Sequence, residues 1–368
     1  MDQLISTNKK AEKLNSLSLY KKRLGQKRLT LLITALVSLL VAFYSIKKGA
    51  IDLTVDQIIK VFLGQGDSQA SLVILNIRLP RALAAILVGA ALASSGTVMQ
   101  CVLQNQLASA STLGVSQGAA FGAALGIVVF GGGIVSSAST NVAMEINNPY
   151  IVTLSAFVFG LASTLVILFI ARLKKSLGPG SLILAGVALS SLFTGAFTLL
   201  QFFADDSQLG AVVFWTFGNL GSASWSNLLV IALVLVFSLG YFMINSWNYN
   251  AMSTGTDTAQ SLGVDTRRLM LITMTVSSLT AAVSVSFVGI ISFIGLVAPH
   301  IMRIFLGDDY RFLIPGSALA GALILLLADN LARLLIAPIV LPIGALTSFL
   351  GAPVFLYLLI KGASNARN

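Results

Sequence analysis

Few side chains in this sequence could do covalent or metal chemistry. The 368-residue chain has one cysteine, Cys101, and one histidine, His300. Single copies exclude a disulfide framework, a zinc site built on several thiolates and a multi-histidine metal site. The motifs G-x-x-x-x-G-K-[ST], H-E-x-x-H and G-x-S-x-G are all absent. The sequence therefore predicts no catalytic residues, no metal, no cofactor and no ATP hydrolysis by this chain.

The acidic residues argue against ion coupling. All thirteen lie in loops or near the ends of apolar segments. Asp329 is the deepest, and Arg333 follows it at i+4, so the two can form an ion pair on one helix face. An isolated carboxylate inside the membrane, which typically marks proton or sodium coupling, is not found. These absences favour a passive conduit or one that a partner drives.

Two arginines, Arg78 and Arg81, flank a Leu-Pro pair at the start of an apolar segment. A guanidinium offers a planar fork to carboxylates and stays charged. Two roles are open for these arginines: they could bind carboxylates on a partner, or they could anchor the chain to phospholipid headgroups. We expect both side chains near water. Nearby carboxylates that could pair with them are Asp52, Asp56 and Asp67.

The composition shows which kind of protein must position these residues. The hydrophobic fraction is 56% and the charged fraction 10%, whereas soluble domains have about 45–50% and about 25%. This excludes a soluble enzyme, a disordered chain and, despite the net charge of +10, a nucleic-acid binder. The sequence predicts an all-α integral membrane protein in the lipid bilayer.

Nine apolar segments are long enough to span a hydrocarbon core of about 30 Å. They are residues 29–46, 82–103, 112–130, 150–171, 182–203, 227–244, 269–290, 312–336 and 343–360. Residues 293–305 are a tenth, shorter candidate that contains Pro299 and is expected to be a broken or half-depth helix buried against others. Ten transmembrane helices are therefore predicted.

The positive charges favour ten crossings with both termini inside. With that topology, seventeen of the 23 Lys and Arg residues lie on the cytoplasmic side, as the positive-inside rule requires. The predicted organisation is a basic cytoplasmic tail (1–28), a transmembrane domain (29–361) and a cytoplasmic tail (362–368). The basic tail either lies on anionic lipid or binds a partner. Residues 51–63 have apolar residues at helical spacing and predict a short amphipathic helix on the outer surface.

Four stretches carry a family resemblance. They are NIRLPRALAAILVG from residue 76, LILAGVALSS from residue 182, FVGIISFIGLVAPHIMRIF from residue 287 and LPIGALTSFLGAPVFLYLLIK from residue 341. Together they resemble the FecCD-type permease subunits of bacterial ABC importers, which take up ferric siderophores, haem and cobalamin. The resemblance covers about residues 29–361.

The resemblance implies a ten-helix permease in the bacterial cell membrane. Its partners would be a second permease (a copy or a paralogue), two cytoplasmic ATPase subunits and an extracytoplasmic substrate-binding protein. The path for an iron chelate or related macrocycle would run between the two permeases. The alternative is a secondary transporter driven by an ion gradient.

The resemblance also assigns docking residues. Arg78, Arg81 and Arg333 match positions that meet carboxylates of the binding protein. The loop 245–268 matches the ATPase-docking loop, which forms two short helices. Its matching residues are Gly255, Asp257, Ala259 and Gly263. Thr256 stands where an acid is common in the family, with Asp257 next to it.

Two turns and one aromatic residue are further candidates. In similar permeases, the turns that here contain Asn105 and Leu107, and Pro179 and Gly180, close the cytoplasmic end of the path. Ordinary turn formation by Gly and Pro is the alternative. Trp215 lies in VVFWTFGNL, which resembles a helix at the outer mouth. It would line the path, or belong to an interfacial aromatic belt.

Overall fold

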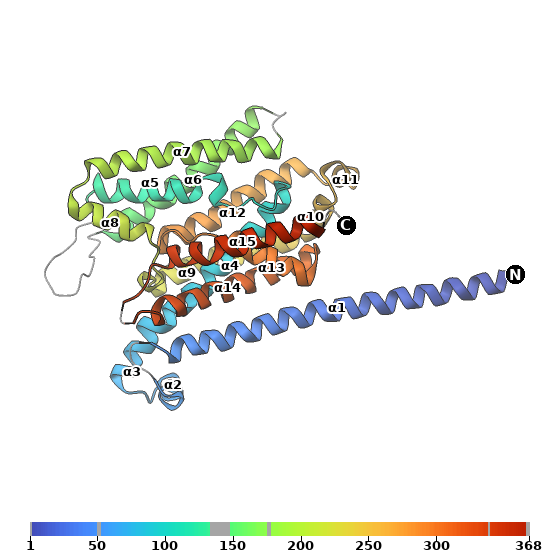
Figure 1. The fold of residues 1–368 in the computed structure, drawn as a ribbon, viewed down its shortest axis with the longest axis horizontal. Coiled ribbons are helices and arrows are strands. Elements are labelled where there is room, and N and C mark those ends of the chain that lie inside the picture. Colours follow the sequence, from blue (N-terminus) through green and yellow to red (C-terminus); the bar gives the residue numbers. More distant parts are fainter. Residues whose placement is uncertain (1, 50–52, 133–147, 175–177, 338, 366–368) are drawn as a thin grey trace.

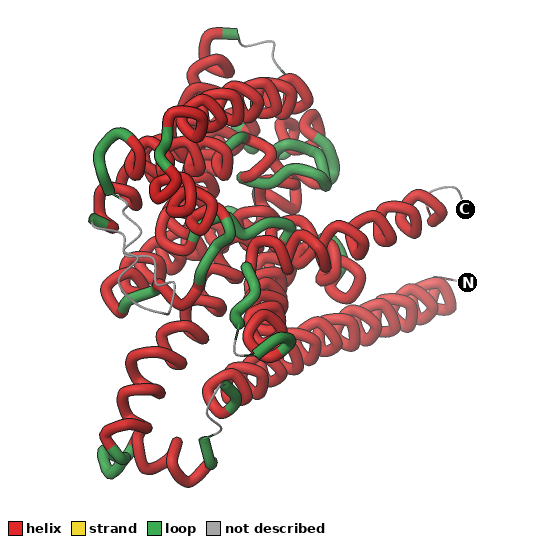
Figure 2. Tube along the Cα trace, turned by 60° about the vertical axis from the view of Figure 1, so that its left-hand side comes forward, coloured by secondary structure: helices red, strands yellow, loops and turns green. Residues whose placement is uncertain are grey.

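The computed structural model describes all residues except 1, 50–52, 133–147, 175–177, 338 and 366–368. Its described part consists of helices and loops without a β-strand (Figure 2). The helices run roughly along one direction in a bundle, and the first helix extends beyond it (Figure 1). The predicted all-α architecture is confirmed.

Seven helices are long and apolar enough to cross a membrane, which makes this a multi-pass membrane protein. Six of them are single α-helices: α1 (Asp2–Lys47), α6 (Pro149–Leu173), α7 (Pro179–Phe203), α9 (Trp225–Ile244), α12 (Thr266–Val288) and α14 (Tyr310–Leu334). The seventh apolar stretch, Ser68–Val102, joins α3 (Ser68–Leu72), a π-helical turn η1 (Val73–Arg78) and α4 (Leu79–Val102) without a break.

Three further apolar helices complete the ten: α5 (Val115–Val128), α13 (Ile294–Leu306) and α15 (Ile343–Asn365). The pattern predicted a span over 112–130, but α5 has only 14 residues. It starts late because η2 (Ser111–Leu113) and a left-handed Gly114 with φ of 82° come first. At 1.5 Å per residue, α5 is about 21 Å long, less than the thickness of a hydrocarbon core.

Helix α13 corrects one expectation, because it is continuous through Pro299 instead of broken. Proline has no N–H, so the carbonyl of Gly295, four residues earlier, loses its helical partner. The Gln100 side-chain amide of α4 lies 3.5 Å from that oxygen and donates to it. Gln100 in turn accepts from Arg303 of α13 at 3.3 Å. Helix α4 thus supplies a hydrogen-bond donor in place of the N–H group that Pro299 lacks.

Helix α4 is the centre of the bundle and packs on α12, α13 and α14. Glycines let these backbones touch. A Cβ at Gly89 of α4 would collide with the Gly321 backbone of α14, and a Cβ at Gly321 would collide with Gly89. The glycine stripe Gly118, Gly122 and Gly126 of α5 meets the α6 backbone in the same way. Small residues that bring backbones together are typical of membrane helix packing.

The bundle has two ends. The α8 end, as we call it, carries α8 (Asp206–Thr216), α2 (Val55–Phe62) and α3 (Figure 1). The amphipathic helix expected over 51–63 corresponds to α2, which buries Ile58 and Val61 and begins with a Thr54 capping box. The α10 end carries α10 (Ser246–Ser253) and α11 (Thr256–Ser261) (Figure 1).

Candidate functional site

The candidate arginines at the α8 end surround one carboxylate. Asp329 of α14 is fully buried, and its two oxygens accept hydrogen bonds from Arg81 Nε at 2.8 Å and Arg333 Nε at 3.0 Å. The predicted i,i+4 pair between Asp329 and Arg333 is therefore present, and Arg81 joins it from α4. Two cations on one anion leave this cluster with a net positive charge.

Arg333 and Arg78 also bind the end of α1. Arg333 donates to the carbonyl oxygens of Ser45 and Lys48 and to the Ser45 hydroxyl. Arg78 Nη1 donates to the carbonyls of Ile46 at 2.8 Å and Lys47 at 2.9 Å. The last carbonyls of a helix lack intrahelical partners and carry partial negative charge. The two guanidinium groups thus cap α1 from α14 and from η1.

One expectation about these arginines is wrong. The sequence predicted that Arg78 lies near water, but only 6% of its surface is exposed. Of the acids named as possible partners, Asp56 pairs instead with Lys60 at 2.6 Å. Asp67 precedes α3, and Asp52 lies outside the described residues. The physical reason for the burial of Arg78 is that the carbonyl groups at the end of α1 accept its hydrogen bonds.

The π-helical turn η1 positions Arg78 and was not predicted. It ends at Arg78, directly before Leu79 and Pro80 begin α4. Pro80 cannot donate to a carbonyl in the preceding turn, and a wider turn accommodates this defect within a continuous helix. The Leu-Pro pair is therefore the sequence signal for an irregular turn, although it does not specify a π-turn.

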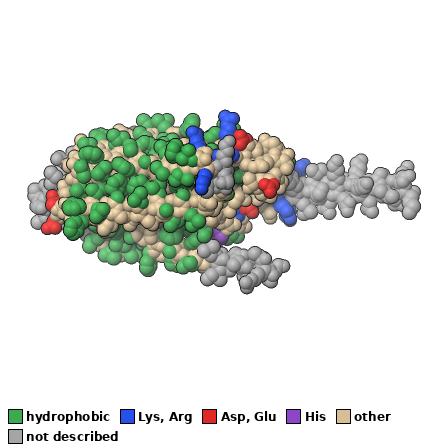
Figure 3. Space-filling view, turned by 90° about the horizontal axis from the view of Figure 1, so that it is seen from above, with side chains coloured by type: hydrophobic (Ala, Val, Ile, Leu, Met, Phe, Trp, Pro, Cys, Tyr) green, Lys and Arg blue, Asp and Glu red, His purple; other side chains and the backbone are tan. Residues whose placement is uncertain are grey.

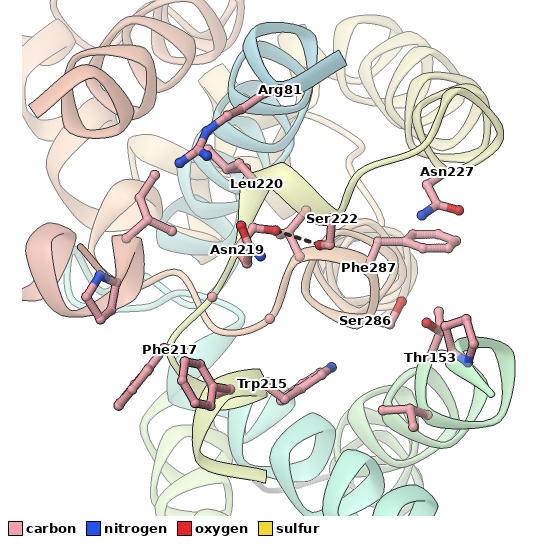
Figure 4. A pocket seen from close by; sticks show the side chains of 18 of the residues that line it. Arg81, Thr153, Trp215, Phe217, Asn219, Leu220, Ser222, Asn227, Ser286 and Phe287 are labelled. Carbon is pink, nitrogen blue, oxygen red and sulfur yellow. Dashed lines mark hydrogen bonds between the residues drawn. The ribbon is translucent and has the colours of Figure 1, made fainter. Parts of the chain in front are cut away.

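A cavity of about 410 Å³ opens beside this cluster (Figure 4). Arg81 of α4 and Trp215 of α8 both line it, so the structure brings a docking candidate and the path-lining candidate to one cavity. Further polar and aromatic lining residues, which sequence analysis missed, are Thr153, Phe217, Asn219, Ser222, Asn227, Ser286 and Phe287. Phe217 and Asn219 belong to the segment VVFWTFGNL that contains Trp215. The others come from helix ends and loops far apart in the chain, so no local motif marks them.

The loop after α8 shapes this cavity. Gly218 has φ of 72°, and Asn219 N–H donates to the Val288 carbonyl at 2.7 Å, which ties the loop to the end of α12. The Asn219 side chain accepts from Gly221 N–H at 2.8 Å. A Cβ at Gly221 would lie 3.2 Å from Arg81 Nη1. The guanidinium of Arg81 therefore reaches from buried Asp329 to the loop at the cavity.

At the α10 end, the candidate ATPase-docking loop forms the two short helices α10 and α11. Gly255 and Gly263 bracket α11 with φ of 120° and 86°, a region in which glycine is favoured. Ala259 is fully buried, and Asp257 lies in the first turn of α11. The two glycines are therefore explained by backbone conformation, because a Cβ on either would meet almost no neighbour.

Two large apolar side chains project from this loop and were not predicted. Trp247 of α10 is 65% exposed and Leu262, the C-cap of α11, is 69% exposed. Both lie beyond the apolar helix α9, in a segment whose other large apolar side chains, Tyr249 and Met252, are buried. An exposed Leu after a Gly-flanked short helix is a signal that sequence analysis could have used.

A charged cluster connects α10 to the rest of the bundle. Asp309, the N-cap of α14, accepts from Arg311 at 2.7 and 2.9 Å and from the Asn250 amide of α10 at 3.2 Å. Lys27 of α1 lies 3.5 Å from it. Arg311 also stacks over the Trp247 ring at 4.3 Å. The hydrogen bonds from Arg311, with a smaller contribution from Asn250, lower the pKa of Asp309 to about 2.

The four gate candidates lie in two exposed or half-buried turns. The Asn105 side chain accepts from Leu107 N–H at 2.8 Å and so shapes its own turn. Pro179 and Gly180 form the first turn of α7. No hydrogen bond joins the two turns among the described residues. Within the same part of the chain, no group of His, Cys, Asp or Glu is arranged to hold a metal.

Known proteins resemble this chain over nearly its whole length. The FecCD transport family model matches residues 35–361. An ABC transporter permease protein of Methanocaldococcus jannaschii is 54% identical over 331 residues, which cover 90% of this chain and 93% of that one. The hemin transport system permease protein HmuU of Yersinia pestis is 38% identical over 292 residues, which cover 78% of this chain and 83% of that one.

A solved structure agrees with this relationship. The inward-facing conformation of a metal-chelate-type ABC transporter matches with a TM-score of 0.77 at 32% identity, over 90% of this chain and 98% of that chain. The helices of this chain thus follow the same course as those of a protein that is also related to it in sequence. On the evidence of the matched motifs, the fold and these relatives, the chain belongs to the FecCD transport family.

Proposed function

We propose that this chain is the membrane-spanning permease subunit of an ATP-driven importer for an iron chelate or a related macrocycle. The observation that carries the proposal is the α10–α11 pair, which exposes Trp247 and Leu262 at one end of a chain that has no phosphate-binding loop. Exposed large apolar and aromatic side chains are typical anchors in protein interfaces. ATP hydrolysis would then take place on partner subunits.

The proposed orientation puts the α10 end in the cytoplasm, together with residues 1–28 and 362–368. Most lysines and arginines that flank the apolar helices belong to this end, including Arg267, Arg268, Arg303 and Arg311. The positive-inside rule supports that side as cytoplasmic. The loop 245–268 would then face two ATPase subunits, one for each of two permeases.

The second permease, a copy or a paralogue, would cover α7. This helix exposes Leu184, Leu192, Phe202 and Phe203 and buries little of its length in the chain itself. The substrate would pass between the two permeases, with Trp215 on the wall of its outer mouth. The turns with Asn105 and Leu107, and with Pro179 and Gly180, would close the cytoplasmic end.

An extracytoplasmic binding protein would dock at the α8 end. Arg81 supports this best, because it contacts the cavity and belongs to a cluster with excess positive charge. The substrate class follows from relatives that import hemin and metal chelates. The binding protein would deliver an iron chelate or macrocycle to the cavity of about 410 Å³.

Reconstitution into vesicles tests the function. The chain with its partner permease, ATPase and binding protein should accumulate a ferric chelate against its gradient only when ATP is supplied on the ATPase side. The same vesicles without ATPase should show no uphill uptake under a proton or sodium gradient. Uphill uptake with an ion gradient alone would establish the alternative, a secondary transporter.

A further inference from the structure

A second cavity, of about 340 Å³, lies at the α10 end between α1 and the turn that joins α13 to α14. Its lining residues from α1 are Arg23, Leu24 and Lys27, and those from the turn and α14 are Leu306, Gly307, Asp309 and Arg311. Gly307 ends α13 with φ of 69°. The cavity is thus built by two segments about 280 residues apart in sequence.

The charge of this cavity is positive. Three cations, Arg23, Lys27 and Arg311, share it with one carboxylate, Asp309. Both carboxylate oxygens of Asp309 already accept from Arg311, and Asn250 binds one of them from outside the cavity. The four charged side chains have a net charge of +2, and Asp309 holds two of the three cations, Lys27 and Arg311, in place for an anion that enters.

The position of the cavity favours a lipid over a soluble anion. Directly after Lys27, α1 exposes Leu29, Leu32 and Leu36, and α13 ends with exposed Ile304 and Phe305. The surface of α1 and α13 therefore changes here from apolar to charged. On the face that Figure 3 shows, hydrophobic side chains likewise cover most of the bundle, and most of the Lys and Arg side chains in view lie toward one end. Acyl chains can lie on the apolar side chains while the phosphate reaches the cations.

We propose that this cavity binds the phosphate headgroup of an anionic glycerophospholipid. Basic pockets between membrane helices are known to favour such headgroups. The bound lipid would join α1 to the α13–α14 turn, whose Asp309 also holds α10. This inference depends on the membrane-spanning fold and stands whether or not the proposed transport function is correct.

The test uses the full chain in nanodiscs of phosphatidylcholine that contain about 20% phosphatidylglycerol. Native mass spectrometry counts the phosphatidylglycerol molecules retained. Wild type should retain at least one in preference to phosphatidylcholine. Arg23→Gln should lower retention about fivefold, as expected for one cation at a membrane surface. Lys22→Gln removes the same charge from the neighbouring position, outside the cavity, and should leave retention unchanged.

Three outcomes would overturn the proposal. Equal losses from Arg23→Gln and Lys22→Gln would mean diffuse attraction without a site. If inorganic phosphate stabilised the protein in pure phosphatidylcholine against heat as much as phosphatidylglycerol does, the ligand would be a free anion. Release of phosphatidylglycerol by an added ATPase subunit would point to a protein occupant. Unchanged unfolding midpoints of both variants in phosphatidylcholine exclude misfolding as the cause.

Discussion

The two ends of the bundle hold their candidate docking residues in opposite ways. At the α8 end, Arg78 donates hydrogen bonds to the end of α1, and Arg333 donates to the end of α1 and to Asp329. At the α10 end, Trp247 and Leu262 remain largely exposed on short helices, and Arg311 stacks over one face of the Trp247 ring. A shared family position therefore says little about whether a side chain is available to a partner. Substitutions at the α8 end should cost stability first, and those at the α10 end should cost association first.

The largest effect is expected for Asp329→Asn. Removal of the charge leaves Arg81 and Arg333 facing each other without a counter-ion, and breaking a buried ion pair costs about 3–5 kcal/mol. Thermal unfolding in detergent and the yield of folded protein measure this loss. Asp56→Asn is the matched control, because its ion pair with Lys60 is exposed and worth about 0.5 kcal/mol or less. Similar losses for both variants would contradict the buried network.

The second prediction concerns association at the α10 end. Leu262→Arg should lower co-purification of the ATPase about tenfold or more, because a charged side chain replaces an apolar anchor. Leu63→Arg is the control: it is also the C-cap of a short helix and is 66% exposed, but lies at the α8 end. Unfolding midpoints should stay near the wild-type value for both. Undiminished ATPase binding by Leu262→Arg would remove the basis of the docking assignment.

A smaller effect separates the two possible duties of Arg81. Arg81→Gln should lower stability and also weaken binding of the partner protein severalfold, with a smaller dependence on salt than wild type. Charged contacts at an interface rim chiefly set the encounter rate and the salt dependence. Titration of the binding protein at 50 and 500 mM salt, about the range in which screening changes most, measures both. If the unfolding midpoint of Arg81→Gln falls but its affinity for the binding protein and the salt dependence of binding do not change, Arg81 serves the fold alone.

The smallest effect is the pH dependence of Asp309. Its pKa falls from 3.8 to about 2 on folding, so the folded state favours the charged form. The stabilisation is complete above pH 3.8 and declines as the pH falls toward 2. The midpoint difference between wild type and Asp309→Asn should therefore be constant from pH 7 to about 5 and shrink below about 4. A constant difference at all pH values would mean that the carboxylate charge is not what stabilises α10.

Patterns local in sequence predicted the elements well. Apolar runs predicted the helices, and the apolar residues at helical spacing over residues 51–63 predicted α2. The positions of the arginines could not be predicted, because the acceptors of Arg78 are the end of another helix about 30 residues away. Arg81 and Asp329 are 248 residues apart. The role of Gly255 and Gly263 in docking stays a prediction; within this chain their positive φ angles, and not close contact, account for glycine at both positions.

The interlocked glycines of α4 have a mechanical consequence. Where Gly89 meets Gly321, and Gly96 meets Gly295, backbone lies on backbone without a side-chain layer between them. Sliding one helix past the other would drive carbonyl groups into each other, so α4, α13 and α14 can tilt together but cannot shear. Helix α7 is less tightly held: Gly186 meets the Thr112 backbone, but Gly180 and Gly195 have open space around them. In the proposed importer, opening of either side would then move α7 and its neighbours against α4, α13 and α14, which move as one body.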